Sequence, residues 1–185
     1  MEDSGIVALY WAREEAAIEH TAQKYGAYLE KIACNILSDR EDSQECANDT
    51  YLRAWNSMPT QRPSVLTTYL GRIVRGLAID RYRRRTSAKR APSTYALSLS
   101  ELGEICGGEE PETVLQQKHL EEAIGAFVRG LSPEARTLFL GRYYYFDSLK
   151  EVAAYCGMGE AKAKSLLHRT RQKLRIYLEQ EGFSL

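Results

Sequence analysis

The sequence predicts an all-α protein in which two small helical domains are joined by a flexible linker. Apolar residues recur at steps of three and four along most of the chain, a spacing that puts them on one face of a helix. The apolar–polar alternation of a half-buried strand is not found. Proline and glycine gather between residues 91 and 112, where the helical spacing stops. We therefore expect domains at residues 1–90 and 113–185, with an acidic linker at residues 91–112.

Three amphipathic runs build the predicted first domain, within residues 18–36, 47–58 and 66–77. Pro59 and Pro63 separate the second run from the third, and the residue before a proline disfavours helical geometry. Residues 56–65 are therefore expected to form a loop. The apolar faces consist of Ile18, Ala22, Tyr25, Leu29, Ile32 and Ile36, then Ala47, Tyr51, Ala54 and Met58, then Leu66, Leu70, Ile73 and Leu77.

The most specific local pattern is DSLKEVAAYCGMGEAKAKSLLHRTRQKL, residues 147–174. Ser148 and Glu151 have the spacing of a capping box, and Gly157 suits a tight turn before a second helix. That second helix has an apolar seam, and its opposite face carries Ser165, His168, Arg169 and Gln172. The pattern predicts a helix–turn–helix that reads a DNA major groove, with a solvated basic face as the alternative. The seam consists of Ala163, Leu167, Thr170, Leu174 and Leu178.

Helical spacing also precedes this motif, at Leu120, Ile124, Phe127 and Leu131. Ser132 followed by Pro133 is a favourable N-cap with proline in the first helical position. The second domain is therefore expected to be helical from its start.

Charge is distributed in blocks although the chain has 25 basic and 25 acidic residues and a formal net charge of zero. Residues 59–95 hold nine basic residues and one acidic residue, and residues 136–185 hold nine and five. Residues 1–58 and 96–135 are acidic. Such blocks suggest separate surfaces for different partners, and the basic ones suit a nucleic acid.

The composition argues against several other classes of protein. The apolar runs are shorter than the ~18 residues that cross a bilayer, and the acidic N-terminus lacks the features of a secretory signal. The four cysteines form no CxxC pair, and the three histidines do not cluster. We therefore expect a cytoplasmic protein without membrane insertion, cofactor or metal site, whose thiols are reduced.

Two charged helices are expected in the first domain. Glu41, Glu45 and Asp49 share one helical face, which is either solvated or docks on a protein; metal binding is disfavoured because no E-x-x-H histidine accompanies them. The segment DRYRRRTSAKR, residues 80–90, holds six basic residues and ends a helix that also contains Tyr69 and Tyr82. Basic side chains interleaved with aromatic rings suit single-stranded nucleic acid.

Together these segments resemble a bacterial RNA polymerase sigma factor of the extracytoplasmic-function (ECF) group in the sigma-70 family. The resemblance rests on SQECANDTYLRAW and YLGRIVRGLAIDRYRR in sigma region 2, and on LSPEARTLF, SLKEVA and AKSLLHRTR in region 4. Gly76 departs from the pattern where the family often has asparagine, and Gly159 stands at the usual serine or threonine N-cap.

The resemblance implies partners and roles. Core RNA polymerase is expected to bind Glu45, Asn48, Asp49 and Arg53, with Trp55 as packing, and the loop at residues 56–65 is expected to capture a flipped −10 base. The acidic linker is expected to thread the RNA path of the polymerase. Melted −10 DNA is expected to contact Arg72, Arg75, Arg81, Arg83 and Arg84. Duplex −35 DNA is expected to contact Lys162, Lys164, Ser165, His168, Arg169 and Arg171.

Two other functions remain open at this stage. A helix–turn–helix regulator that acts without polymerase would leave the acidic helix and the −10-like basic helix unused. An enzyme acting on nucleic acid is disfavoured, because the sequence lacks a Ser/His/Asp order, a metal-ligand cluster and a phosphate-binding glycine loop. We therefore expect no catalytic residues. An anti-sigma protein is a further partner that the sequence leaves open.

Overall fold

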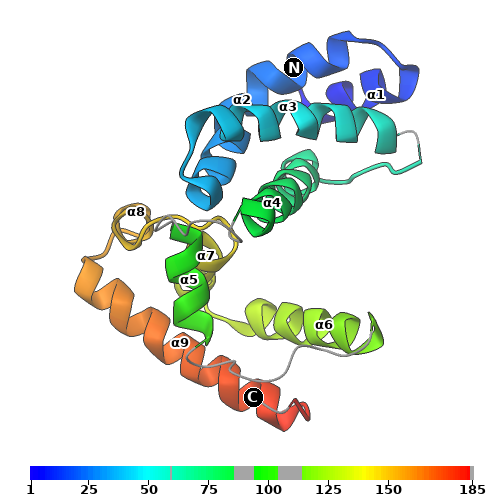
Figure 1. The fold of residues 1–185 in the computed structure, drawn as a ribbon. Coiled ribbons are helices and arrows are strands. Elements are labelled where there is room, and N and C mark those ends of the chain that lie inside the picture. Colours follow the sequence, from blue (N-terminus) through cyan, green and yellow to red (C-terminus); the bar gives the residue numbers. More distant parts are fainter. Residues whose placement is uncertain (59, 86–93, 104–113, 184–185) are drawn as a thin grey trace. The chain divides into compact units, whose positions relative to one another are not determined.

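The computed structural model describes residues 1–58, 60–85, 94–103 and 114–183. Within these ranges every regular element is an α-helix (Figure 1). The chain divides into two compact units, Met1–Thr94 and Tyr95–Leu185, each of which is described by itself. The all-α prediction is confirmed.

Unit 1 consists of α1 (Asp3–Ala12), α2 (Ala16–Leu37), α3 (Arg40–Ser57) and α4 (Leu66–Arg85). Helices α2, α3 and α4 pack against one another in all three pairings, and α1 packs against α2. Their apolar faces meet in a core from which water is excluded, and this burial is the main stabilising term. The largest fully buried side chains of the unit are Tyr10, Ile6, Leu29, Ile32, Ile36, Met58, Leu66, Leu70 and Val74.

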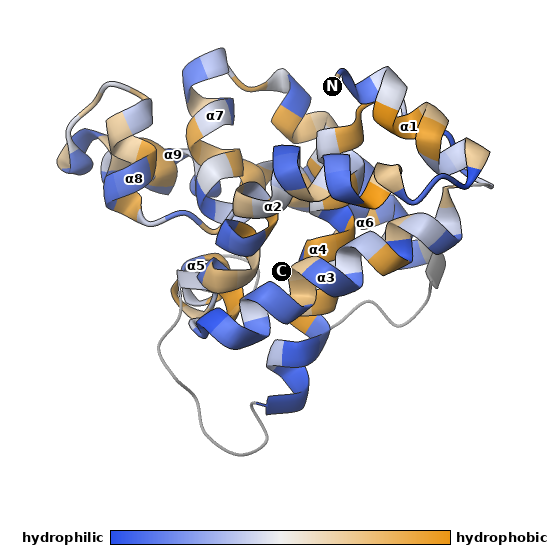
Figure 2. Ribbon diagram, turned by 90° about the horizontal axis from the view of Figure 1, so that it is seen from above, coloured by the Kyte–Doolittle hydropathy of each residue, from blue (hydrophilic) through white to orange (hydrophobic). Residues whose placement is uncertain are grey.

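The predicted apolar faces are correct for α3 and partly so for α4. All four predicted α3 positions from Ala47 to Met58 are buried. In α4 the buried stripe runs from Leu70 to Val74 and Ala78, whereas Ile73 and Leu77 are only half-buried. Steps of four therefore continue along α4, and the buried stripe drifts around the helix as it proceeds. Figure 2 shows that the ribbon of α4 changes from hydrophobic to hydrophilic toward its C-terminal end.

Helix α1 covers one side of the unit 1 core. Ile6 and Tyr10 are fully buried, and the Tyr10 hydroxyl donates a hydrogen bond to Thr21 Oγ1 at 3.0 Å. The helix ends at Arg13, which adopts a left-handed backbone conformation. Figure 1 shows α1 beside the C-terminal end of α3, and the rings of Tyr10 and Trp55 meet edge to face with centroids 6.2 Å apart.

Unit 2 consists of α5 (Thr94–Gly103), α6 (Val114–Gly130), α7 (Pro133–Tyr143), α8 (Leu149–Tyr155) and α9 (Glu160–Gln180). Helix α9 packs against α6, α7 and α8. All five residues of its predicted seam are buried, as the sequence predicts. The core of the unit contains Ala123, Leu138, Phe139, Tyr143, Val152, Ala153, Ala163, Leu167, Leu174 and Leu178.

Helix α5 occupies part of the segment that the sequence predicts as a linker. The Tyr95 ring meets the Phe146 ring edge to face at 4.9 Å, and Ser98 Oγ donates to the Arg142 carbonyl at 3.1 Å. Residues 95–103 are therefore a helical part of unit 2, within the segment that the sequence predicts as a flexible linker. The rest of the predicted linker, residues 91–93 and 104–112, lies outside the described residues.

The helix–turn–helix of α8 and α9 is held by local features that the sequence predicts. Ser148 Oγ accepts from the Glu151 amide, and the Glu151 carboxylate accepts from the Ser148 amide, which completes the capping box. Gly157 has φ of 64°, a conformation that costs little only for glycine. Behind the motif, α7 approaches α8 so closely that a Cβ at Gly141 would overlap the Tyr155 hydroxyl and a Val152 methyl.

Candidate nucleic-acid interface

Helix α9 presents most of the predicted −35 residues on the side opposite its buried seam. Lys164, Ser165, His168 and Arg169 are exposed. Lys162 is also exposed, and its ammonium lies 3.1 Å from a Glu134 carboxylate oxygen. A surface ion pair of this kind contributes only about 0–1 kcal/mol, so a DNA phosphate could displace it.

Arg171 is oriented differently from these five residues. Only 11% of its side chain is exposed. Its Nη1 donates to the Tyr143 hydroxyl at 2.7 Å and to Glu101 Oε2 at 3.4 Å. Arg171 therefore joins α9 to α7 and α5, and it does not share the exposed face of His168.

Glu101 of α5 is the centre of this buried polar network. Its carboxylate accepts from Arg142 Nη2 at 2.7 Å and from the Tyr143 hydroxyl at 2.9 Å, and the side chain of Arg142 is only 4% exposed. Burial raises the pKa of Glu101, but the hydrogen bonds from Arg142 and Tyr143 outweigh that effect and leave its pKa below the usual value. The pKa of the Tyr143 hydroxyl is raised, mainly by burial. The network therefore contains an ionised Glu101 at neutral pH, with two arginines beside it.

Arg169 lines a groove as well as lying on the exposed face of α9. The groove has a volume of about 500 Å³, and its lining includes Phe127, Leu131 and Leu166 together with Arg169 and Lys173. Its lining therefore combines apolar side chains with basic ones. His168 and Ser165 do not line this groove, so they are the less ambiguous candidates for contact with base edges.

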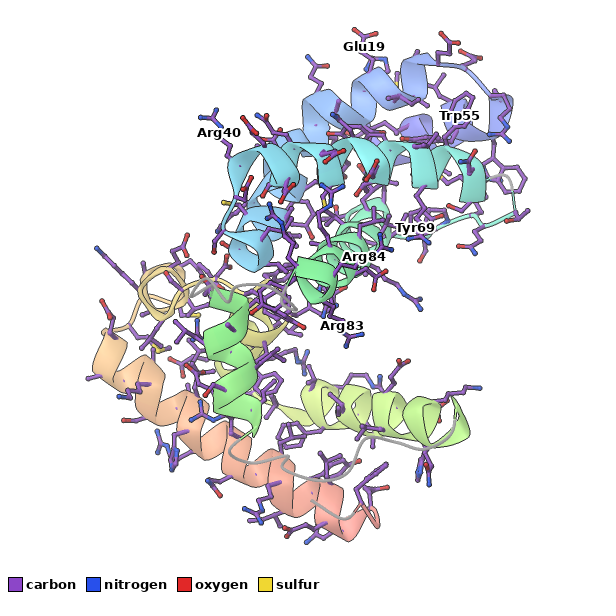
Figure 3. All side chains as sticks on the ribbon, viewed as in Figure 1. Glu19, Arg40, Trp55, Tyr69, Arg83 and Arg84 are labelled. Carbon is purple, nitrogen blue, oxygen red and sulfur yellow. The ribbon has the colours of Figure 1, made fainter. Side chains whose placement is uncertain are left out.

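Helix α4 carries the predicted −10 residues along its length. Arg72, Arg83 and Arg84 are exposed, and Arg75 is half-buried. Figure 3 labels Arg83 and Arg84 at the end of α4, where the Arg83 side chain extends away from α3. These arginines form a basic surface that a nucleic-acid backbone could follow.

Arg81 instead turns toward α3. Its side chain is 25% exposed, and Nη1 donates to Glu45 Oε2 at 2.7 Å and to the Asp42 carbonyl at 3.2 Å. Its Nη2 lies 3.5 Å from Asp49 Oδ2. The structure thus brings a residue expected to bind DNA together with two residues expected to bind polymerase.

Arg85 extends the same ion cluster toward the start of α3. Its guanidinium pairs with Asp42, and Nη2 lies 3.6 Å from Asp39 Oδ2. Asp39 is the N-cap of α3, and its pKa is lowered first by the hydrogen bond from the Asp42 amide and further by Arg85. We call this set of six residues the α3–α4 ion cluster: Asp39, Asp42, Glu45, Asp49, Arg81 and Arg85.

The outer face of α3 carries the predicted polymerase-binding residues. Glu45, Asn48 and Arg53 are exposed, and Asp49 is half-buried. Leu52 was missed by the sequence reasoning, although it is 59% exposed. It follows Glu45 by seven residues and Asn48 by four, so at 100° per residue all three lie in one narrow stripe. An apolar residue four and seven positions after polar residues of an acidic helical face was the feature of the sequence that could have indicated Leu52.

The corner formed by α1, the end of α3 and the following loop contains both tryptophans of the chain. Trp55 is half-buried, its carbonyl accepts from Arg13 Nη1 at 2.7 Å, and the Arg13 guanidinium lies 5.1 Å from the centre of its ring. Trp11 is 45% exposed, and the guanidinium of Arg62 from the loop lies 5.6 Å from its ring centre. Two arginines therefore lie over two indoles at the loop expected to capture a base.

The described ranges contain neither a metal-binding group nor a membrane-spanning helix. In that part of the chain, histidine, cysteine, aspartate and glutamate do not form a group of three or more that could hold a metal ion. None of the helices there is both long enough and apolar enough to span a bilayer.

Comparison with known proteins gives a match in each of the two units. The Sigma-70 region 2 family model matches residues 21–88, and the Sigma-70, region 4 model matches residues 121–174. "ECF RNA polymerase sigma factor SigE" of Mycolicibacterium smegmatis is 25% identical over 182 residues, which cover 96% of this chain and 68% of that protein. "ECF RNA polymerase sigma factor SigL" of Mycobacterium tuberculosis is 26% identical over 175 residues, which cover 92% and 94%. With regions 2 and 4 present in order, and with relatives of this group matched along nearly its whole length, the chain belongs to the ECF group of the sigma-70 family of RNA polymerase sigma factors.

Proposed function

We propose that this sigma factor uses α9 for duplex −35 DNA, α4 and the loop at residues 56–65 for melted −10 DNA, and the outer face of α3 for core RNA polymerase. As a sigma factor it directs promoter-specific transcription by RNA polymerase. The assignment of surfaces rests on α9. One side of this helix is a buried apolar seam, and the other side is exposed and carries polar and basic residues. A helix of this kind is what a major groove admits.

For the −35 element, Lys164, Ser165 and His168 are the proposed base-reading residues, with Arg169 beside them. Lys162 is proposed to contact a phosphate, because its pairing with Glu134 is exposed and weak. Arg171 is proposed to act through position: it fixes α9 against α5 and α7 while the other residues meet DNA.

For the −10 element, Arg72, Arg75, Arg83 and Arg84 are the proposed phosphate contacts. Pairing of arginines with phosphates, together with capture of one base by the loop, would offset the few kcal/mol that unstacking a base costs. Arg81 could reach DNA only by leaving the carboxylates of α3. Its proposed role is therefore to orient the end of α4, so that Arg83 and Arg84 lie along the strand.

For core polymerase, the stripe of Glu45, Asn48 and Leu52 is the proposed centre of the contact, with Asp49 and Arg53 at its edge. Such a stripe fits a partner surface that combines basic side chains with an apolar recess, since exposed apolar residues flanked by charges mark protein interfaces. We propose that the protein is a recognition subunit that catalyses no reaction and binds no cofactor. It is proposed to work in the cytoplasm together with RNA polymerase.

Reconstitution with core RNA polymerase tests this proposal. The holoenzyme is offered a DNA library randomised at the −35 and −10 positions, and the selected sequences are used in runoff transcription. We expect a defined motif at both elements and transcripts that require both core and this protein. An Asn48→Lys, Leu52→Ala variant, which leaves the Arg81–Glu45 pair intact, should fail to bind core while it keeps the thermal stability of the wild type. A wild-type protein that binds DNA specifically without ever associating with core would overturn the proposal.

A further inference from the structure

Trp11 stands out because it is a large aromatic side chain left 45% exposed on a helix whose core-facing residues, Ile6, Val7 and Tyr10, are buried. Ile6 and Tyr10 fix α1 against the core, and the Tyr10 hydroxyl bonds Thr21, so the indole is presented from a rigid element. Residue 11 precedes the segment that matches region 2, which begins at residue 21, and therefore the family match assigns it no role.

One side chain from the loop that we propose captures a −10 base, that of Arg62, lies over Trp11. The Arg62 guanidinium lies over the indole at 5.6 Å, and Gln61 and Ser64 of the same loop are exposed. On the other side, Arg13 lies over Trp55 at 5.1 Å and holds its carbonyl. An exposed indole with a guanidinium over its ring, and a second arginine–indole pair in the same corner, has the composition of a site for single-stranded nucleic acid, where bases stack and phosphates meet arginine.

We infer that Trp11 is a stacking position for an unpaired base of the melted −10 strand, next to the base captured by the loop. This inference rests on the proposed function of that loop. The base takes the place of the Arg62 guanidinium on the indole, and Arg62 moves to the phosphate of the same nucleotide. Glu14 and Glu15 are exposed and follow Arg13 directly, so they disfavour a phosphate on their side of the corner. The phosphate therefore lies on the Arg62 side.

The test uses holoenzyme reconstituted from the full chain and a promoter fragment with a duplex −35 element and an unpaired −10 strand. A series of fragments carries one abasic nucleotide at each unpaired position in turn. The proteins are the wild type, Trp11→Leu, which keeps apolar bulk without a planar ring, and Trp11→Phe, which keeps a ring. Leu97→Ala is the matched control, because Leu97 is an exposed apolar residue of unit 2.

We expect Trp11→Leu to bind the intact fragment roughly tenfold more weakly, and Trp11→Phe and Leu97→Ala to bind it nearly as well as the wild type. An abasic nucleotide at one particular position of the fragment should weaken binding by the wild type by a similar factor. The same abasic fragment should bind Trp11→Leu no more weakly than the intact fragment does. Equal abasic penalties in wild type and Trp11→Leu would overturn the inference, even though the proposed function would survive. Weaker core binding by Trp11→Leu without any change on the abasic series would also overturn it, in favour of a protein contact. If the wild-type holoenzyme does not distinguish the promoter from scrambled DNA, the proposed function itself fails.

Discussion

Arg81 on α4 donates a 2.7 Å hydrogen bond to Glu45 on α3, so a side chain expected at DNA and one expected at polymerase bind each other. Asp49 and Asp42 complete the acidic side of this contact. The pairing ties α3, which is proposed to meet core RNA polymerase, to α4, which is proposed to meet the −10 strand. Replacement of either side should therefore affect the unit as a whole, and not one partner alone.

Arg81→Ala should lower the free energy of unfolding of the protein by about 1–2 kcal/mol, between the values for exposed and buried ion pairs. The loss arises because three carboxylates remain close together without their shared cation. Urea denaturation followed by circular dichroism measures it, with Arg81→Lys as the conservative control. Unchanged stability in Arg81→Ala, combined with a lower salt dependence of DNA binding, would instead make Arg81 a direct phosphate contact.

Arg83→Ala and Arg84→Ala should impair promoter opening with little effect on stability, because both side chains are exposed. Each lost contact with a single-stranded phosphate should lower the slope of log K against log salt by about 0.7. Permanganate reactivity of thymines near the start site measures opening, and Lys31→Ala, which removes an exposed charge from α2, is the control. Unchanged reactivity in both arginine variants would remove them from the −10 surface.

His168→Ala should change the preferred −35 sequence. A lost base contact costs about 1–3 kcal/mol at the position that it reads, while other positions are unaffected. Selection from a randomised −35 library measures the change. Recovery of the wild-type motif would show that His168 is only an exposed helical residue.

Arg171→Ala should behave in the opposite way, because its side chain is 11% exposed and bound to Tyr143 and Glu101. We expect the −35 motif to stay the same and the thermal stability to fall. The comparison with His168→Ala in the same selection and in the same melting experiment separates reading from positioning. A changed motif in Arg171→Ala would place its guanidinium at the DNA.

Glu101 should make the stability of unit 2 dependent on pH in the acidic range. Its pKa in the folded protein is lowered from 4.5, so its contribution is complete above that value and is lost as pH falls through the folded pKa. The charged groups that face it are Arg142 and Arg171, with the Tyr143 hydroxyl. Glu101→Gln should therefore be less stable than wild type at pH 7, and the difference should shrink below pH 4.5. Melting temperatures of both proteins between pH 7 and pH 3 measure this, and a constant difference would contradict it.

The sequence alone predicted the elements whose apolar spacing is regular. The faces of α3 and α9 and the capping box of α8 are determined by residues close together in the chain, so local patterns suffice. Helix α5 was missed because its pattern is misleading. Leu97 and Leu99 are exposed, whereas Ser98 between them is buried and bonds the Arg142 carbonyl. A polar residue buried by a partner 44 positions away has no local signature.

The candidate site was predictable in its residue types but not in its pairings. A count of arginines in α4 and α9 treats all of them as available for DNA. Arg81 and Arg171 were engaged by carboxylates on other helices, and their distances in sequence, 36 residues to Glu45 and 70 to Glu101, gave no hint of it. Tertiary packing decides which charged side chains pair with each other within a domain. The spacing of residues in the sequence does not reveal these pairings.

Gly141 shows how narrowly the orientation of the reading helix is set. A single methyl group there would collide with Val152 and Tyr155, so α8 could remain only by moving away from α7. Because a turn of a few residues joins α8 to α9, any such shift would be transmitted to the residues that are proposed to face the base edges. With α9 as the proposed reader of the −35 element, promoter choice would be coupled to a steric limit behind the motif, at a buried glycine of α7.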